Sequence, residues 1–136
     1  MFEVLEHAAD VGFRVQARSL PEMFECAGEA LVALAMETEN IETRQSYPLE
    51  AEGDSEESLL VNWLSEILYY IDGRRLAMRR FQVLELARNH LRGVALGELR
   101  DQSRHPARLV IKGVTYHQLK IEQTANGWVS EVFLDV

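Results

Sequence analysis

The sequence predicts an α+β fold in which a mostly antiparallel β-sheet carries two packed α-helices, in a single domain over residues 1–136. Two long segments repeat apolar residues at helical spacing, and the second half of the chain alternates apolar and polar residues. Between two of the alternating runs lies Asn126-Gly127, which tolerates the positive φ of a tight hairpin. Strand, helix, strand, helix and then a run of strands is an order typical of this class.

The first helix follows two expected strands, over residues 2–5 and 11–17, the second of which alternates apolar and polar residues. Ser19-Leu20-Pro21-Glu22 has the spacing of a capping box, so the helix should begin there and end near Met36. Cys26 falls within this helix and is expected to be a small buried side chain rather than a nucleophile.

The second helix is expected to begin at Asp54 or Ser55 and to end at Asp72-Gly73. It follows a polar loop over residues 37–46 and an alternating strand over 47–51, which Pro48 places at a sheet edge. The remaining strands are expected over residues 81–86, 91–99, 109–116, 118–123 and 128–134.

Composition narrows the class of function. A formal net charge of −8 argues against non-specific nucleic-acid binding, which needs Lys and Arg, but permits docking onto a basic partner. One cysteine excludes an intrachain disulfide and a multi-cysteine zinc site. No apolar run approaches the ~20 residues that span a membrane, and no signal-peptide pattern opens the chain. We therefore expect a cytoplasmic protein that makes no membrane contact.

Candidate ligands gather near both ends of the sequence. Glu6, His7 and Asp10 lie within five residues of one another, and Asp135 precedes the last residue, Val136. Carboxyl groups gathered together cannot all stay ionised without a cation between them, and such hard oxygen ligands suit Ca²⁺ or Mg²⁺ rather than zinc. Spacing alone equally allows a simpler interpretation, in which Asp10 caps a turn and Asp135 ends a strand.

Other polar residues give weaker indications. The histidines show no closely spaced metal-binding pair, and His117, beside Tyr116, is either site lining or plain surface. Lys112 and Lys120 lie in strand patterns, where a lysine can hold its ammonium near phosphate or carboxylates. No P-loop, Gly-x-Gly-x-x-Gly or Gly-x-Ser-x-Gly motif occurs, so nucleotide-driven or serine-hydrolase activity has no support.

Two arginine-rich runs, over residues 74–80 and 100–108, interrupt this acidic chain. No aromatic residues interleave them as a single-strand RNA binder would require, so we expect solvated faces.

From about residue 3 to the end, the sequence resembles the archease family. Gly97-Glu98 and Arg104-His105 also stand in positions familiar from that family. The segments that carry the resemblance in this order are Glu6-His7-Ala8-Ala9-Asp10-Val11-Gly12, Leu59-Leu60-Val61-Asn62-Trp63-Leu64-Ser65-Glu66, Ile111-Lys112-Gly113-Val114-Thr115-Tyr116-His117 and Leu134-Asp135-Val136.

The resemblance implies a non-enzymatic activator of a GTP-dependent RNA ligase. That ligase joins 3′-phosphate or 2′,3′-cyclic-phosphate ends to 5′-hydroxyl ends in tRNA splicing and RNA repair. The activator would promote guanylylation of the ligase histidine and multiple turnover, and would meet RNA only indirectly. The family fold, a sheet with two helices, agrees with the pattern described above.

The resemblance also implies a site. A divalent metal, seen as calcium in the family with Mg²⁺ or Mn²⁺ as alternatives, would be held by Asp10, Asp135 and an oxygen of Val136. Lys112 would be the functionally important lysine. Glu6, His7 and His117 are candidates for lining this site. The family usually has Thr where this chain has Ala8, and often Ala where it has Gly113.

Two alternatives stay open. One is an independent metal-dependent RNA phosphodiesterase, with Asp10 and Asp135 as ligands and His117 as base. The other is a metal-independent, chaperone-like interaction module whose acidic face docks a basic partner.

Overall fold

The computed structural model describes residues 1–7 and 10–136, and for Glu6 and His7 the backbone alone. The elements in this part of the chain are β1 Phe2–His7, β2 Asp10–Ala17, α1 Leu20–Ala35, β3 Gln45–Glu52, α2 Glu56–Asp72, β4 Leu76–Leu86, β5 His90–Leu99, β6 Gly113–Thr124 and β7 Gly127–Asp135.

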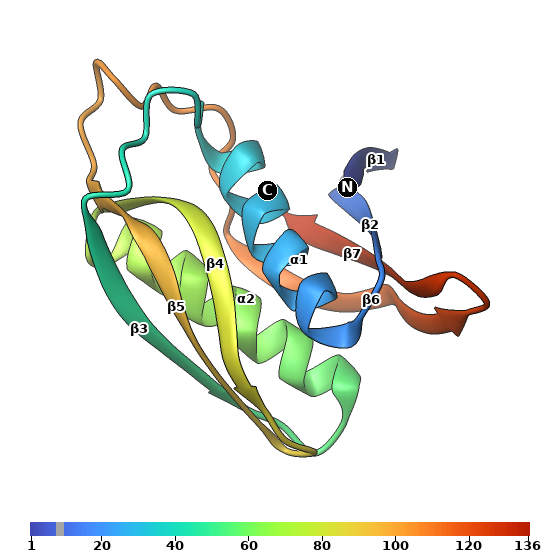
Figure 1. The fold of residues 1–136 in the computed structure, drawn as a ribbon. Coiled ribbons are helices and arrows are strands. Elements are labelled where there is room, and N and C mark those ends of the chain that lie inside the picture. The colour runs from blue at the N-terminus through green and yellow to red at the C-terminus, as the bar shows by residue number, and fades with distance from the viewer. Residues whose placement is uncertain (8–9) are drawn as a thin grey trace.

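The strands form two sheets, and the two helices lie between them (Figure 1). One sheet has the order β1-β2-β7-β6 and the other β3-β5-β4, with every neighbouring pair antiparallel. The α+β class and the antiparallel pairing are confirmed, whereas the expected single sheet is divided in two. Both helices bury more than one narrow stripe, so each needs a sheet on two sides.

The helix ends follow the capping signals. The Ser19 hydroxyl accepts a hydrogen bond from the Glu22 N–H (3.3 Å), and α1 ends at Ala35 as expected. Ser55 caps α2 and exchanges two hydrogen bonds with Ser58, each 3.1 Å long. Each cap is worth ~1 kcal/mol of helix stability.

Cys26 is half-buried on α1 and packs against the core. Burial raises the pKa of its thiol, which disfavours the reactive thiolate. Its position is therefore that of a packing residue rather than a nucleophile.

The last third of the chain differs from the expected three strands. β6 and β7 form one hairpin, as the Asn-Gly pair predicts. The turn residues are Ala125 and Asn126, and Gly127 takes the positive φ (137°) while already paired with Thr124. Residues 109–112 precede β6 and are not part of it. The N–H groups of Arg108 and Leu109 instead bond the carbonyls of Ala35 and Leu34 at the end of α1 (2.9 and 3.1 Å).

The arginine-rich runs were expected to be solvated faces, but two of their arginines donate hydrogen bonds to the loop after α1. Arg79 donates to the carbonyls of Thr38 and Glu39 (3.1 and 2.7 Å), and Arg104 donates to that of Asn40 (2.7 Å). Neither helix in the described part of the chain is long and apolar enough to cross a membrane.

Candidate functional site at the end of the four-stranded sheet

Asp10 and Asp135 lie side by side in the four-stranded sheet. β2 begins at Asp10, β7 ends at Asp135, and the two residues are directly opposite each other in the antiparallel register. Directly opposed residues have Cβ atoms ~4.5–5.5 Å apart on the same face of the sheet. The strand next to β2 contributes the backbone of His7, and the strand next to β7 contributes Gly113.

Burial of apolar residues dictates this alignment. Phe13 on β2 and Leu134 on β7 are buried in the core, so residues one position away along each strand lie on the other face of the sheet, Asp135 among them. Because the side-chain period is two, a slip of one residue would turn this apolar set to solvent.

Gly12 fixes the same register by close approach. A Cβ atom at Gly12 would lie 2.4 Å from the Val132 carbonyl oxygen and 2.8 Å from Cδ1 of Phe133. The Phe133 ring therefore covers Gly12, its opposite residue on β2, two positions from the aspartate pair. Only a glycine leaves room for this contact.

The electrostatics of the pair favour a cation. Asp10 is half-buried and Asp135 exposed. Within the described part of the chain, no Lys, Arg or His side chain forms an ion pair with either carboxylate. Two like charges directly opposite on a sheet destabilise it, and a divalent cation between them removes the repulsion.

The donor set fits a hard cation but is incomplete as side chains alone. No group of three or more His, Cys, Asp or Glu side chains able to hold a metal occurs among the residues that the structure describes. A third ligand would therefore come from a main-chain or terminal oxygen, and half-buried Val136 directly follows Asp135. All-oxygen sets of this kind suit Ca²⁺, which accepts carboxylates, carbonyls and water together.

The backbone of Lys112 is hydrogen-bonded to the aspartate site. Its N–H donates to the carbonyl oxygen of Asp135 (2.7 Å), and its side chain is exposed. It lies just before β6 rather than within a strand. Lys120 is different, because it pairs with Glu122 (3.2 Å) and stands opposite Glu131.

No described side-chain contact joins the three candidate lining residues to the aspartate pair. His117 is exposed in an irregular part of β6, where its N–H donates to Oγ1 of Thr115 (3.2 Å). Glu6 and His7 stand opposite Val11 and Asp10 by backbone register, but their side chains lie outside the description. Ala8 lies outside the described residues altogether.

A buried charged cluster, which residue spacing did not indicate, holds the segment that leads to Lys112. The Glu98 carboxylate accepts two hydrogen bonds from Arg104 (3.0 and 2.7 Å) and one from the Glu42 N–H (2.8 Å). It also meets Nε2 of His105 at 3.0 Å. These groups, Arg104 first, lower the pKa of Glu98 to about 2.

The hydrogen-bond partners of His105 determine its tautomer. Its ring is fully buried, and Nδ1 accepts a hydrogen bond from the Asp101 N–H (3.0 Å). Nε2 must therefore carry the proton that it shares with Glu98. The only sequence signal for this cluster was the resemblance at Gly97-Glu98 and Arg104-His105, since nothing in their spacing predicts contact.

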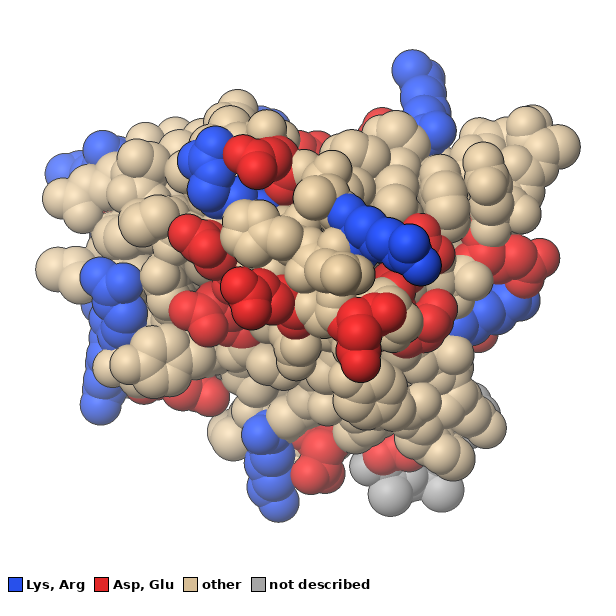
Figure 2. All heavy atoms as spheres, turned by 90° about the horizontal axis from the view of Figure 1, so that it is seen from below, with Lys and Arg blue, Asp and Glu red and all other residues tan. Residues whose placement is uncertain are grey.

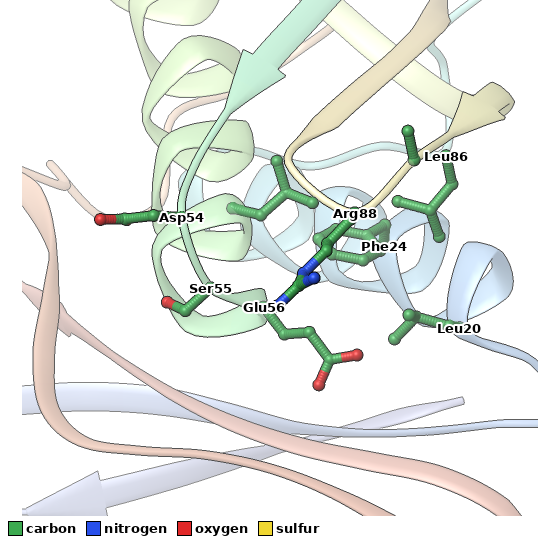
Figure 3. A pocket seen from close by; sticks show the side chains of 9 residues that line it. Leu20, Phe24, Asp54, Ser55, Glu56, Leu86 and Arg88 are labelled. Atoms are coloured by element: carbon green, nitrogen blue, oxygen red, sulfur yellow. The ribbon is translucent and has the colours of Figure 1, made fainter.

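A separate pocket of about 540 Å³ opens at the starts of both helices. Figure 3 shows Arg88 and Glu56 at this pocket, together with Phe24 and Leu20. Leu20 follows the end of β2 opposite to Asp10, roughly 25 Å away for an eight-residue strand. The pocket is therefore not part of the aspartate site.

Acidic side chains gather on the face seen from below in Figure 2. Two shallow hollows of the molecule are lined by acids of β3, α2 and the turn between them, namely Glu50, Glu52 and Glu66 in one and Glu52 with Asp54 in the other. Such a surface attracts a basic partner.

Two antiparallel sheets enclosing two helices, with opposed aspartates at the end of one sheet, define a small α+β protein with an oxygen-rich site. Residues 2–136 match the Archease protein family (MTH1598/TM1083). The archease of Methanopyrus kandleri is 36% identical over 138 residues, which cover 99% of each chain. That of Methanosarcina mazei is 34% identical over 139 residues, covering 99% of this chain and 95% of the relative. This chain belongs to the archease family.

Solved structures agree with this assignment. The solution structure of protein 1598 from Methanobacterium thermoautotrophicum superposes with a TM-score of 0.84 at 28% identity, covering 99% of this chain and 98% of that one. A Thermotoga maritima crystal structure, described as an archease and possible chaperone, has a TM-score of 0.63 at 20% identity, over 97% and 94% of the two chains. The second likeness bears on the fold alone.

Proposed function

We propose that this protein activates a GTP-dependent RNA ligase in tRNA splicing or RNA repair, in the cytoplasm, without being an enzyme itself. The observation that carries the proposal is the register that opposes Asp10 to Asp135, with Lys112 bonded to the Asp135 backbone, in a chain of the archease family. The expected effect is faster guanylylation of the ligase histidine and multiple turnover.

The site residues have separate roles in this proposal. Asp10, Asp135 and an oxygen of Val136 would hold a divalent metal, with Ca²⁺ the first expectation and Mg²⁺ or Mn²⁺ as alternatives. The bound metal would supply positive charge that offsets the carboxylates and the phosphates of the partner's nucleotide. The exposed ammonium of Lys112 would stabilise negative charge on a triphosphate, since nucleotidyl transfer depends chiefly on positioning and charge neutralisation.

The test is single-turnover guanylylation of a cognate ligase with Asp10→Asn, Asp135→Asn and Lys112→Ala variants. Each should reduce the stimulation by at least tenfold, because each removes a charge from the site. Glu37→Gln is the matched control, since Glu37 is an exposed acid outside the site. Undiminished stimulation by both aspartate variants would contradict the proposal.

The chaperone-like alternative is favoured by a specific observation, the acidic face of Figure 2. It predicts that Asp10→Asn leaves stimulation intact, whereas reversing the charges of Glu50, Glu52 and Glu66 abolishes it. The phosphodiesterase alternative gains no further ligand among the described residues, and His117 makes no described contact with either aspartate. RNA cleavage by the purified protein that disappears in Asp135→Asn would restore it.

A further inference from the structure

The middle of β6 protrudes from the edge of the four-stranded sheet. Thr115 stands opposite Phe133 and Lys120 opposite Glu131, so residues 116–119 of β6 span a single residue of β7, Val132. The chain must bulge outward to fit four residues against one. β6 is an edge strand in the described sheet, so nothing in that sheet pairs with its outer side.

This protrusion is an ordered part of the fold. Oγ1 of Thr115 donates to the Phe133 carbonyl (3.2 Å) and accepts from the His117 N–H (3.2 Å). Gln118 takes a φ of 55°, in the left-handed region that side chains rarely adopt. A conformation of this kind costs of order 1–3 kcal/mol and persists only where surrounding structure enforces it.

Its side chains do little for the core. Tyr116 is 57% exposed, and His117 and Gln118 are exposed as well. Leu119 alone packs against the core. The fold therefore maintains a strained bulge that presents an aromatic ring and an imidazole to solvent.

Both lysines of this acidic chain flank the protrusion. Lys112 precedes β6 and Lys120 directly follows the bulge, and both are exposed. Gly113 and Lys120 stand opposite Asp135 and Glu131, four residues apart on β7, which corresponds to about 13 Å. At this spacing the two ammonium groups can reach one ligand lying across the bulge, for which Lys120 would exchange its exposed pair with Glu122 (3.2 Å).

We propose that the protrusion at residues 116–119 binds a nucleotide, whose base stacks on Tyr116 beside His117 while Lys112 and Lys120 hold its phosphates. An aromatic surface between cations is the combination that binds single-stranded nucleic acids and nucleotides. No aromatic residue stands within the arginine-rich runs themselves, although Arg74 lies over the ring of Tyr70, 4.8 Å from its centre. The net charge of −8 over the whole chain confines the contact to one or two nucleotides.

The nucleotide could come from either of two sources, GTP or a phosphorylated RNA end. This inference deepens the proposed function, and the biological role of the nucleotide site rests on that function. If the nucleotide is an RNA end, the protein would contact RNA directly rather than only through the ligase. The binding itself is measurable without the ligase.

The test is an NMR titration of the ¹⁵N-labelled full chain at low salt, with GTP in one arm and a short RNA bearing a 3′-phosphate in the other. Amide signals of residues 116–120 should shift in at least one arm, and the arm with tighter binding identifies the source. Tyr116→Ala should weaken binding by about tenfold or more, because stacking on an aromatic ring is lost. Tyr116→Phe keeps the ring and should bind normally.

Tyr69→Ala is the matched control, because Tyr69 is 59% exposed on α2 and should not affect binding. Absence of shifts at the protrusion in both arms, or equal binding by the Tyr116→Ala and Tyr69→Ala variants, would overturn the inference. The inference would also fail if the wild-type protein bound no nucleotide and Tyr116→Ala lost binding to the ligase, because the protrusion would then contact the ligase instead. Asp10→Asn should bind nucleotide normally while failing to activate the ligase, so the two proposals can fail separately.

Discussion

Glu98 is the residue on which two loops converge. It is 7% exposed, and its carboxylate bonds Arg104 and His105 from the loop after β5 and the Glu42 N–H from the loop after α1. The loop after β5 ends at Lys112, whose N–H bonds Asp135. The buried carboxylate thus fastens one end of the segment that delivers the candidate lysine.

Glu98 should therefore make stability depend on acid. Its pKa falls from an ordinary 4.5 to about 2 on folding. A carboxyl with a lowered folded pKa stabilises the protein above its unfolded pKa, and this stability is lost as the pH falls from about 4.5 toward 2. We expect Glu98→Gln to lower the free energy of unfolding at pH 7 by roughly 1–3 kcal/mol.

Urea unfolding followed by circular dichroism measures this effect. The difference between wild type and Glu98→Gln should shrink as the pH approaches 2, where wild-type Glu98 is itself protonated. Glu37→Gln, at an exposed site, should leave stability within ~0.5 kcal/mol. A Glu98→Gln effect that stays constant from pH 7 to 2.5 would show that the carboxylate charge is not the cause.

At the scale of elements, local signals were predictable and non-local ones were not. Helix caps and hairpin turns depend on neighbouring residues. The caps at Ser19 and Ser55 and the hairpin turn marked by Asn126-Gly127 could therefore be predicted. The division into two sheets depends on which helix faces the strands cover, which is set by packing across the chain. The bulge of β6 depends on Thr115 bonding the carbonyl of Phe133, a residue on another strand.

The candidate site shows the same limit. Asp10 and Asp135 lie at opposite ends of the sequence, so residue spacing alone did not predict that they form one site. Only the family resemblance indicated this. Their opposition requires β7 to pair with β2, which no local pattern specifies.

The β2–β7 pairing itself can be tested at Gly12. We expect Gly12→Ala to lower the free energy of unfolding by about 1–3 kcal/mol and to weaken Ca²⁺ binding, because its Cβ would meet the Val132 carbonyl at 2.4 Å. Gly113→Ala on β6, the strand on the other side of β7, is the control, since a Cβ there meets nothing within 4 Å. Thermal unfolding and calcium calorimetry of both variants measure the two effects. Equal behaviour of the two variants would count against close packing at Gly12 as the determinant of register.

At the scale of the whole molecule, the fold brings distant parts of the sequence to one end of a sheet. By backbone register, one row across β1, β2, β7 and β6 holds in turn His7, Asp10, Asp135 and Gly113. The opposite ends of these strands hold Met1 and the β6–β7 turn, where the Met1 ammonium approaches Sγ of Cys26 (3.7 Å). The two ends of the four-stranded sheet are therefore chemically different, one acidic and one not.

This difference predicts that additions at the two ends of the sequence have unequal effects. A few residues appended after Val136 would crowd Asp135 and the oxygens of Val136, so we expect Ca²⁺ affinity and ligase guanylylation to fall as far as in Asp10→Ala. Deleting Val136 should do the same. The same residues placed before Met1 lie at the other end of β1 from His7 and should leave both quantities unchanged. Calorimetry with Ca²⁺ and single-turnover guanylylation compare the three variants, and normal values for both the C-terminally extended chain and the Val136 deletion would show that the site does not need Val136.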